Sequence, residues 1–351
     1  NVGKTELDIV FTALHGTSIV SVPPALAKAG FTNVQLVEAQ STPDGNFPTV
    51  ASPNPEESAA LAMAVAQAEA TNADLVIGCD PDTDRVGIAV NDGTDKMQLL
   101  NGNDTAALLV HYILDAYKTN GTLPANGFTA ATVVTTDLIA DISAAYGVPC
   151  YRCLTGFKWI ADIINNKPEE QFLVGGEESY GYLIGDEVRD KDAVASAVMI
   201  AEMAANAKAQ GRTVLQQLEA IHREFGQYQE RLIAVTKKGR SGAQEIADMM
   251  TALRNDPPKT LAGSPVIIAI DHGKSTQTDL LTGATSSTEL PASNVLQFIT
   301  ETGDKVSARP SGTEPKIKFY FSVRATTGDS HAETKAELER KIDTFIKELN
   351  L

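Results

Sequence analysis

The chain has 351 residues, of which 43% are hydrophobic and 21% are charged. These proportions are typical of a globular protein with room for two or three domains. Aspartate and glutamate number 45 against 29 lysines and arginines, which gives a net charge of −16. This excess argues against nucleic acid as the main partner, because a polyanion would be repelled. Any bound phosphate must therefore be held by a local cluster of positive groups.

No apolar run reaches the roughly 18 to 20 residues that a membrane-spanning helix needs, and no secretory signal opens the chain. The sequence therefore predicts a cytoplasmic protein without a membrane partner. The cysteines, Cys79, Cys150 and Cys153, are too few for a disulfide framework and lack the second pair that a zinc site needs. Because Asn1 is not a methionine and an apolar stretch follows closely, we expect a piece of a longer protein.

From residue 7, short β-rich runs alternate with longer helical stretches. In the first set, strands are expected at 7–14, 33–39, 74–79 and 86–90, and helices at 18–29 and 56–71. In a second set of the same design, strands are expected at 128–136, 148–153 and 171–179, and helices from 137, from about 156 and at 192–209. This alternation predicts two successive α/β domains with mixed, mainly parallel sheets.

The segment after about residue 223 follows a different pattern. Strands are expected at 229–237, 265–270, 294–300, 305–310 and 316–323, and helices near 241–254 and 330–349. Strands that are adjacent in sequence and joined by turn-rich loops indicate an α+β domain with an antiparallel sheet. We therefore expect three domains, at 1–103, 104–222 and 223–351.

Three loops that follow strands are unusual, and in open parallel sheets ligands bind beyond the carboxyl ends of strands. The first, DPDTDR, sets Asp80, Asp82 and Asp84 at alternate positions and then places Arg85. Like charges at this spacing repel unless a cation or a proton relieves them. An EF-hand is excluded because Arg85 stands where that loop needs glycine. The pattern favours Mg²⁺ shared with a phosphoryl group, and the alternative is an acidic surface turn.

The second loop is GGEESYGYLIGDEVRDKDA, at 175–193. Glu177 and Ser179 would project the same way, and a carboxylate beside a hydroxyl can bind the vicinal hydroxyls of a sugar. The alternative is a helix start in which acids are favoured by the helix dipole.

The third loop is ARPSGTEPKIKF, at 308–319. Arg309 precedes a Ser-Gly-Thr turn whose hydroxyls and backbone N–H groups can surround a phosphate, with Lys316 close behind. The alternative is a plain turn between two strands.

Together, DPDTDR, GGEESYGY with RDKDA, and RPSGTEPKIKFYF resemble the α-D-phosphohexomutase superfamily, specifically bacterial phosphoglucomutase/phosphomannomutase. FTALHGT, PNPEE and LTGFKWI are also similar to that family, so the resemblance covers essentially the whole chain. Such enzymes have four domains, and this chain resembles the second, third and fourth. The first family domain carries a catalytic phosphoserine in a Ser-His-Asn-Pro loop. We therefore expect the nucleophile to be absent and this chain alone to be inactive.

One stretch, VASPNPEES, places Ser52 two residues before an Asn-Pro pair. Pro53 stands where the family has histidine, however, and the segment resembles a Pro-Asn-Pro-Glu motif of the second family domain. Asn54 as N-cap, with Pro55 and Glu57 following, would make a good helix start. We therefore interpret Ser52 as part of a helix start rather than as a nucleophile.

The resemblance implies roles for individual residues. Asp80, Asp82 and Asp84 would hold Mg²⁺, and Arg85 would lie beside the transferring phosphoryl group as the catalytic residue of this chain. The implied substrate-binding residues are Glu177, Ser179, Lys158 and Lys191. The implied phosphate-binding residues are Arg309, Ser311, Gly312 and Thr313. The general acid and base are not identified, because Phe157 and Gly181 stand where some members carry histidine, and His15 is expected to be structural.

The implied reaction interconverts glucose 1-phosphate and glucose 6-phosphate through a phosphoserine enzyme, with glucose 1,6-bisphosphate as intermediate and activator. The expected partners are a hexose phosphate and the missing N-terminal domain of the same polypeptide. Phosphomannomutase or phosphopentomutase activity, a non-catalytic phosphosugar-binding module and a Mg²⁺-dependent phosphatase are the alternatives. Substrate preference depends on pocket shape and hydroxyl contacts, which a sequence does not fix.

Overall fold

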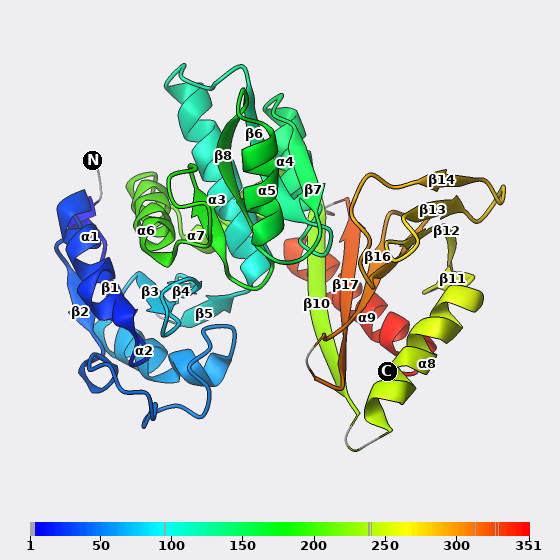
Figure 1. The fold of residues 1–351 in the computed structure, drawn as a ribbon. Helices are drawn as coiled ribbons and strands as arrows, with labels where there is room; N and C mark the ends of the chain where they lie inside the picture. The colour runs from blue at the N-terminus through cyan, green and yellow to red at the C-terminus, as the bar shows by residue number, and fades with distance from the viewer. Residues whose placement is uncertain are drawn as a thin grey trace. The chain divides into compact units, whose positions relative to one another are not determined.

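The computed structural model describes residues 4–351 except 95, 238, 240, 313, 327 and 329. The chain divides into two compact units, Asn1–Ile221 and His222–Leu351. The first unit contains two mixed sheets with covering helices, and the second contains one antiparallel sheet with two long helices (Figure 1). None of the helices in the described part of the chain is long and apolar enough to cross a membrane.

The first sheet has the strand order β2-β1-β3-β4-β5. Its strands are β1 (Ile9–Thr12), β2 (Val34–Leu36), β3 (Leu75–Cys79), β4 (Val86–Asn91) and β5 (Met97–Leu100). The first three run parallel, whereas β4 and β5 are added antiparallel. Its helices are α1 (Val22–Ala29) and α2 (Ser58–Thr71), with short 3₁₀ turns η1 (Lys4–Glu6), η2 (Thr17–Val20) and η3 (Glu38–Gln40). The fully buried strands β1 and β3 are continuous apolar runs, as expected for strands covered on both faces.

The second sheet has the order β7-β6-β8-β9. Its strands are β6 (Gly127–Thr132), β7 (Cys150–Cys153), β8 (Gln171–Gly176) and β9 (Tyr182–Ile184), of which β9 alone is antiparallel to its neighbour. Its helices are α3 (Gly102–Thr119), α4 (Leu138–Ala145), α5 (Lys158–Asn166), α6 (Ala193–Ala209) and α7 (Val214–Phe225). A core of Phe128, Phe172, Phe157 and Ile160 joins α5 to this sheet.

Helix α6 explains why the two sheets form one compact unit. It follows the second sheet in sequence, yet it packs against α1, α3 and strands β3 and β4 of the first sheet (Figure 1). Its buried residues form a broad face and include Ala193, Ala197, Ile200 and Ala204, whereas the opposite side is half-buried or exposed. A broad apolar face lets one helix contact several neighbours. The small alanine side chains let these neighbours approach closely.

The second unit contains an eight-stranded sheet with the order β10-β17-β16-β15-β12-β13-β14, and β11 pairs with β12. Its strands are β10 (Gln227–Thr236), β11 (Thr260–Leu261), β12 (Ser264–Asp271), β13 (Thr276–Asp279), β14 (Thr285–Ser287), β15 (Leu296–Thr300), β16 (Lys305–Pro310) and β17 (Lys316–Ala325). Every pairing is antiparallel. Helices α8 (Gly242–Asn255) and α9 (His331–Glu348) pack on it through a core that includes Met250, Phe319, Phe321, Ile342 and Phe345.

The predicted fold class is confirmed: two α/β sheets of mixed direction are followed by an antiparallel α+β sheet. Several elements were not predicted, namely α3, α7, β5, β9, β11, β13 and β14. The predicted start of α2 at Asn54 was wrong, because the helix begins at Ser58. The domain boundaries 1–103, 104–222 and 223–351 remain a prediction.

Candidate functional site

The aspartate loop, residues 80–85, joins β3 to the antiparallel strand β4. The Asp80 side chain closes it, since its Oδ1 accepts hydrogen bonds from the backbone N–H groups of Asp84 at 3.0 Å and Arg85 at 2.9 Å. Thr83 adopts a left-handed conformation with φ of 65°, which produces the sharp reversal. One carboxylate oxygen from each of the three aspartates lies within 4.8 Å of the others. The structure therefore brings the predicted metal ligands together.

The loop after β1 contacts the aspartate loop at Pro81. Thr17 donates hydrogen bonds to the carbonyl oxygen of Pro81 from its backbone N–H at 2.9 Å and from its hydroxyl at 3.0 Å. A Cβ atom on Gly16 would lie only 2.3 Å from the Cα of Pro81. Glycine is therefore required for this close approach. Both residues belong to the FTALHGT segment, but the sequence did not indicate that they contact the aspartates.

The surroundings of Asp80 disfavour the ionised form of its carboxyl group. Burial raises the pKa of Asp80 to about 7, and the nearby Asp84 and Asp82 add to the rise. The hydrogen bond from the backbone N–H of Arg85 opposes it. A carboxyl group with a pKa this far above its usual range lies in an environment that disfavours its ionised form. A bound divalent cation would favour that form.

Two cationic side chains already contact the loop. The Nη1 atom of Arg85 lies 2.7 Å from Oε1 of Glu56, and its Nε lies 3.7 Å from Oδ1 of Asp84. Lys191, from the segment before α6, places its Nζ 2.9 Å from Oδ2 of Asp84. The pairing of Glu56 with Arg85 was not predicted, because the sequence placed Glu56 only in a helix start.

The charges around the loop favour a bound cation. The three aspartates, Glu56 and Asp190 carry five negative charges when ionised, whereas Arg85 and Lys191 supply two positive charges. Negative charge is therefore in excess, and carboxylate oxygens are the donors that hard cations prefer. The residues present therefore fit the expected magnesium ion.

The second predicted loop lies directly beside the aspartate loop. The backbone N–H of Val86 donates to the carbonyl oxygen of Tyr180 at 3.0 Å, and the backbone N–H of Ala193 donates to that of Thr83 at 3.3 Å. Glu177 is buried, and its Oε1 accepts a 2.7 Å hydrogen bond from the backbone N–H of Gly156. Glu177 thus already has a structural contact, and Ser179 is half-buried in the same loop. Their role in sugar recognition remains a prediction.

The remaining predicted basic site residue of the first unit is Lys158, which is the first residue of α5 and is exposed. Its Nζ lies 5.0 Å from the centre of the Trp159 ring. Within the described residues, no hydrogen bond or ion pair joins Lys158 to the aspartates. His15 is buried, and its ring nitrogens lie 3.2 Å from the carbonyl oxygen of Thr42 and 2.8 Å from the hydroxyl of Thr49. These contacts agree with the structural role expected for His15.

The third predicted loop belongs to the second unit, where it connects β16 to β17. The backbone N–H of Ser311 donates to the carbonyl oxygen of Lys316 at 2.7 Å, and Arg309 lies at the end of β16. Gly312 is exposed, with no atom within 4 Å of the position that a Cβ would occupy. Thr313 lies outside the described residues. β16 and β17 are antiparallel neighbours, and phosphate binding at the loop between them remains a prediction.

Ser52 lies outside the aspartate loop and is half-buried. Its hydroxyl donates a 2.8 Å hydrogen bond to Oε1 of Glu57, just before α2 begins. Asn54 does not cap the helix but accepts a 3.1 Å bond from the backbone N–H of Glu56. The segment therefore forms a turn that places Glu56 against Arg85.

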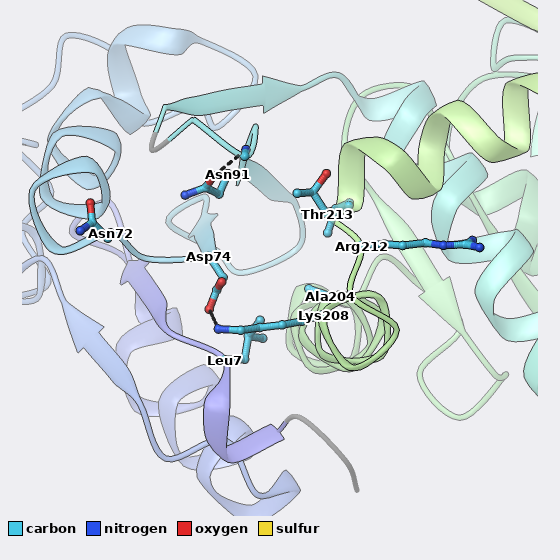
Figure 2. Close-up of a pocket in the computed structure, with 11 residues that line it drawn as sticks. Leu7, Asn72, Asp74, Asn91, Ala204, Lys208, Arg212 and Thr213 are labelled. Carbon is cyan, nitrogen blue, oxygen red and sulfur yellow. Dashed lines mark hydrogen bonds and ion pairs between the residues drawn. The ribbon is translucent and has the colours of Figure 1, made fainter.

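A separate pocket of about 410 Å³ opens at the other end of β4, away from the aspartate loop. It is lined by Asp74, Asn91, Lys208 and Thr213 among others (Figure 2). The Nζ of Lys208 donates to Oδ2 of Asp74 and to the carbonyl oxygen of Glu6, each at 2.7 Å. Asp74 and Lys208 of this lining are thus paired with each other, and the ion pair attaches α6 to the first sheet.

Comparison with known proteins agrees with this geometry. The family models "Phosphoglucomutase/phosphomannomutase, alpha/beta/alpha domain II" and "domain III" match residues 1–93 and 101–225. A phosphoglucomutase of Staphylococcus epidermidis is 38% identical over 321 residues, which are 91% of this chain and 58% of that protein. A protein of Haemophilus influenzae named "Probable phosphomannomutase" is 35% identical, over 98% of this chain and 65% of its own length.

The fold is also found in solved structures. The open form of pp63/parafusin, a phosphoglucomutase from Paramecium, superposes with a TM-score of 0.67 at 16% identity, covering 99% of this chain and 59% of that one. The chain belongs to the α-D-phosphohexomutase superfamily. It spans about three fifths of the length of the curated relatives that it matches.

Proposed function

We propose that this chain provides the metal, sugar and phosphate loops of a Mg²⁺-dependent phosphoglucomutase whose phosphoserine lies on a further domain. The observation that carries the proposal is the aspartate loop, in which three carboxylates converge with too little positive charge beside Arg85. The similarity to phosphoglucomutases supports glucose phosphates as substrates. The three domains would be those predicted, with boundaries at 103/104 and 222/223.

In the proposed reaction, the sugar hydroxyl attacks the phosphorus of the phosphoserine and loses its proton, while the serine oxygen leaves. The resulting glucose 1,6-bisphosphate reorients, and its other phosphoryl group returns to the serine. Mg²⁺ held by Asp80, Asp82 and Asp84 would neutralise charge on the phosphoryl oxygens. Arg85 would contact the same oxygens, because a guanidinium binds phosphoryl groups well.

The other predicted residues would position the sugar. The Glu177 carboxylate would accept hydrogen bonds from the sugar hydroxyls, and the Ser179 hydroxyl would donate a hydrogen bond to one of them. Lys158 and Lys191 would line the same cleft. Arg309, Ser311, Gly312 and Thr313 would bind the phosphate that is not transferred, which fixes the orientation of the substrate.

A second candidate is phosphomannomutase activity, which the similarity to the protein of Haemophilus influenzae favours. The two activities differ in the orientation of one sugar hydroxyl, so they share the same loops and the same metal. Comparing glucose 1-phosphate with mannose 1-phosphate as substrates of one preparation separates them.

The proposal predicts a phosphoserine domain upstream of this chain. It is tested by joining that domain to this chain and measuring Mg²⁺-dependent interconversion of glucose 1- and 6-phosphate. The Asp82→Asn variant should lower turnover more than about 100-fold, since even outer-shell partners of metals contribute 10- to 100-fold. Circular dichroism should show an unchanged fold. Full activity of Asp82→Asn would refute the metal assignment. If the present chain alone released inorganic phosphate from a hexose phosphate, the result would instead support the phosphatase alternative.

A further inference from the structure

Lys191 reaches the aspartate loop through a narrow slot, defined by Gly181 on one side and Phe157 on the other. A Cβ atom on Gly181 would lie 2.3 Å from the Cδ of Lys191 and 2.8 Å from its Cγ. The Nζ of Lys191 lies 5.7 Å from the centre of the Phe157 ring. Only 16% of the Lys191 side chain is exposed. The aliphatic part of Lys191 therefore has space only because residue 181 has no side chain.

The backbone around Lys191 is fixed on both sides. The backbone N–H of Asp192 donates to the carbonyl oxygen of Tyr182 at 2.9 Å, and the Asp192 side chain caps α6 by accepting bonds from Val194 and Ala195. The backbone N–H of Lys191 itself donates to Oδ1 of Asp190 at 2.8 Å. Any change at Lys191 is therefore expected in its side chain rather than in its backbone.

The ammonium group of Lys191 lies against one of the proposed metal ligands. Its 2.9 Å contact is with Oδ2 of Asp84, and a weaker contact of 3.4 Å joins it to the exposed Asp190. Asp84 is one of the three residues whose oxygens converge within 4.8 Å. A divalent cation bound by these oxygens would lie close to the ammonium group, and like charges at such a separation repel.

We infer that Lys191 is the resident counter-ion of Asp84, and that a divalent cation binds the aspartate loop in exchange for it. The inference rests on the proposed metal site. Lys191 is therefore a positioning residue that holds Asp84 while the metal is absent. Once released, its three N–H donors become available to the anionic oxygens of a phosphoryl group, so metal binding would expose a cation for the sugar phosphate.

The test is a calorimetric titration of this chain with Mg²⁺ alone, without any assay of activity. Lys191→Met removes the competing ammonium group and should tighten Mg²⁺ binding roughly tenfold, the size of effect that one nearby charge has on an ionised carboxylate. Gly181→Ala should also tighten binding, because its methyl group pushes Lys191 out of the slot without changing the net charge. The matched control is Lys118→Met, which removes an exposed positive charge from α3 and should leave the affinity unchanged.

The inference is overturned if Lys191→Met binds Mg²⁺ as wild type does or more weakly, or if Gly181→Ala leaves the affinity unchanged. It is also overturned if Lys118→Met tightens binding as much as Lys191→Met, since the effect would then reflect net charge alone. Asp82→Asn separates this inference from the proposed function. If Asp82→Asn binds Mg²⁺ as tightly as wild type, the metal site itself is wrong. If Asp82→Asn loses binding while Lys191→Met is unchanged, only the exchange is wrong.

Discussion

At the scale of single residues, the aspartate loop depends on pairs that are distant in sequence. Sequence reasoning found Asp80, Asp82, Asp84 and Arg85, because alternate acids followed by arginine form a local pattern. The partner of Arg85, Glu56, could not be found in this way. The two residues meet only because the turn before α2 folds back against the start of β4. The charged residues of the loop were therefore predictable from the sequence, whereas the distant residue that contacts Arg85 was not.

Glu56 should determine where the Arg85 side chain points. Without its carboxylate, the guanidinium of Arg85 would turn toward Asp80 and Asp84, which it already approaches at 4.0 and 3.7 Å, and would compete with a metal. We expect Glu56→Gln to weaken Mg²⁺ binding about three- to tenfold in a calorimetric titration. The control is Glu57→Gln, whose carboxylate contacts Ser52 instead. Equal affinities of the two variants would show that Glu56 does not position Arg85.

In the second unit, His222 should make stability depend on pH. It is buried and stacks on His331, with ring centres 5.3 Å apart. Burial lowers the pKa of His222 to about 4, and the positive charges of His331 and Lys335 add to this effect. Because the folded pKa lies below the unfolded value of about 6.5, the stabilisation is complete above pH 6.5 and is lost as the pH falls toward 4.

The loss should amount to about 3 kcal/mol of unfolding free energy. Urea unfolding at several pH values between 7.5 and 4 measures it, and comparison with His222→Leu subtracts the contribution of all other titrating groups. The difference between wild type and variant should change steadily over this range. A difference that stays constant with pH would show that His222 does not cause the loss.

At the scale of elements, sheet direction followed from the alternation of β-rich and helical segments, but strand order and several individual elements did not. Helix α3 was missed although Asn101 caps it, accepting a 2.8 Å bond from the backbone N–H of Asp104. It was missed because the expected domain boundary was placed at residue 103, inside the helix. Strands β13 and β14 contain mainly polar, half-buried or exposed residues, so no hydrophobic pattern revealed them.

The contact between the loop after β1 and the aspartate loop should be intolerant of any side chain at residue 16. A methyl group there would overlap the backbone of Pro81, so Gly16→Ala should cost about 1 to 3 kcal/mol of stability, as overpacking generally does. The displaced loop should also bind Mg²⁺ more weakly. Gly45→Ala provides the control, because no atom lies within 4 Å of its Cβ position. Thermal unfolding measures the stability of both variants, and titration with Mg²⁺ measures their affinity. Equal stability and equal affinity of the two variants would contradict the packing argument.

At the scale of the whole molecule, the first unit brings the aspartate loop and the loop at 175–193 together. The carboxyl ends of β1, β3 and β8 lead into the loops that carry Gly16, Asp80 and Glu177. Helix α6 holds both sheets together, and it begins next to Lys191. The phosphate loop belongs to the second unit.

The most direct test of the central claim is anomalous diffraction from crystals soaked in Mn²⁺ and glucose 1-phosphate, since Mn²⁺ occupies the oxygen-ligand sites that Mg²⁺ prefers. The account predicts an anomalous peak within coordination distance of carboxylate oxygens of Asp80, Asp82 and Asp84. Lys191 should have moved away from Asp84 in the same map. A map with no peak at the aspartate loop, and with the Lys191 ammonium still against Asp84, would contradict it.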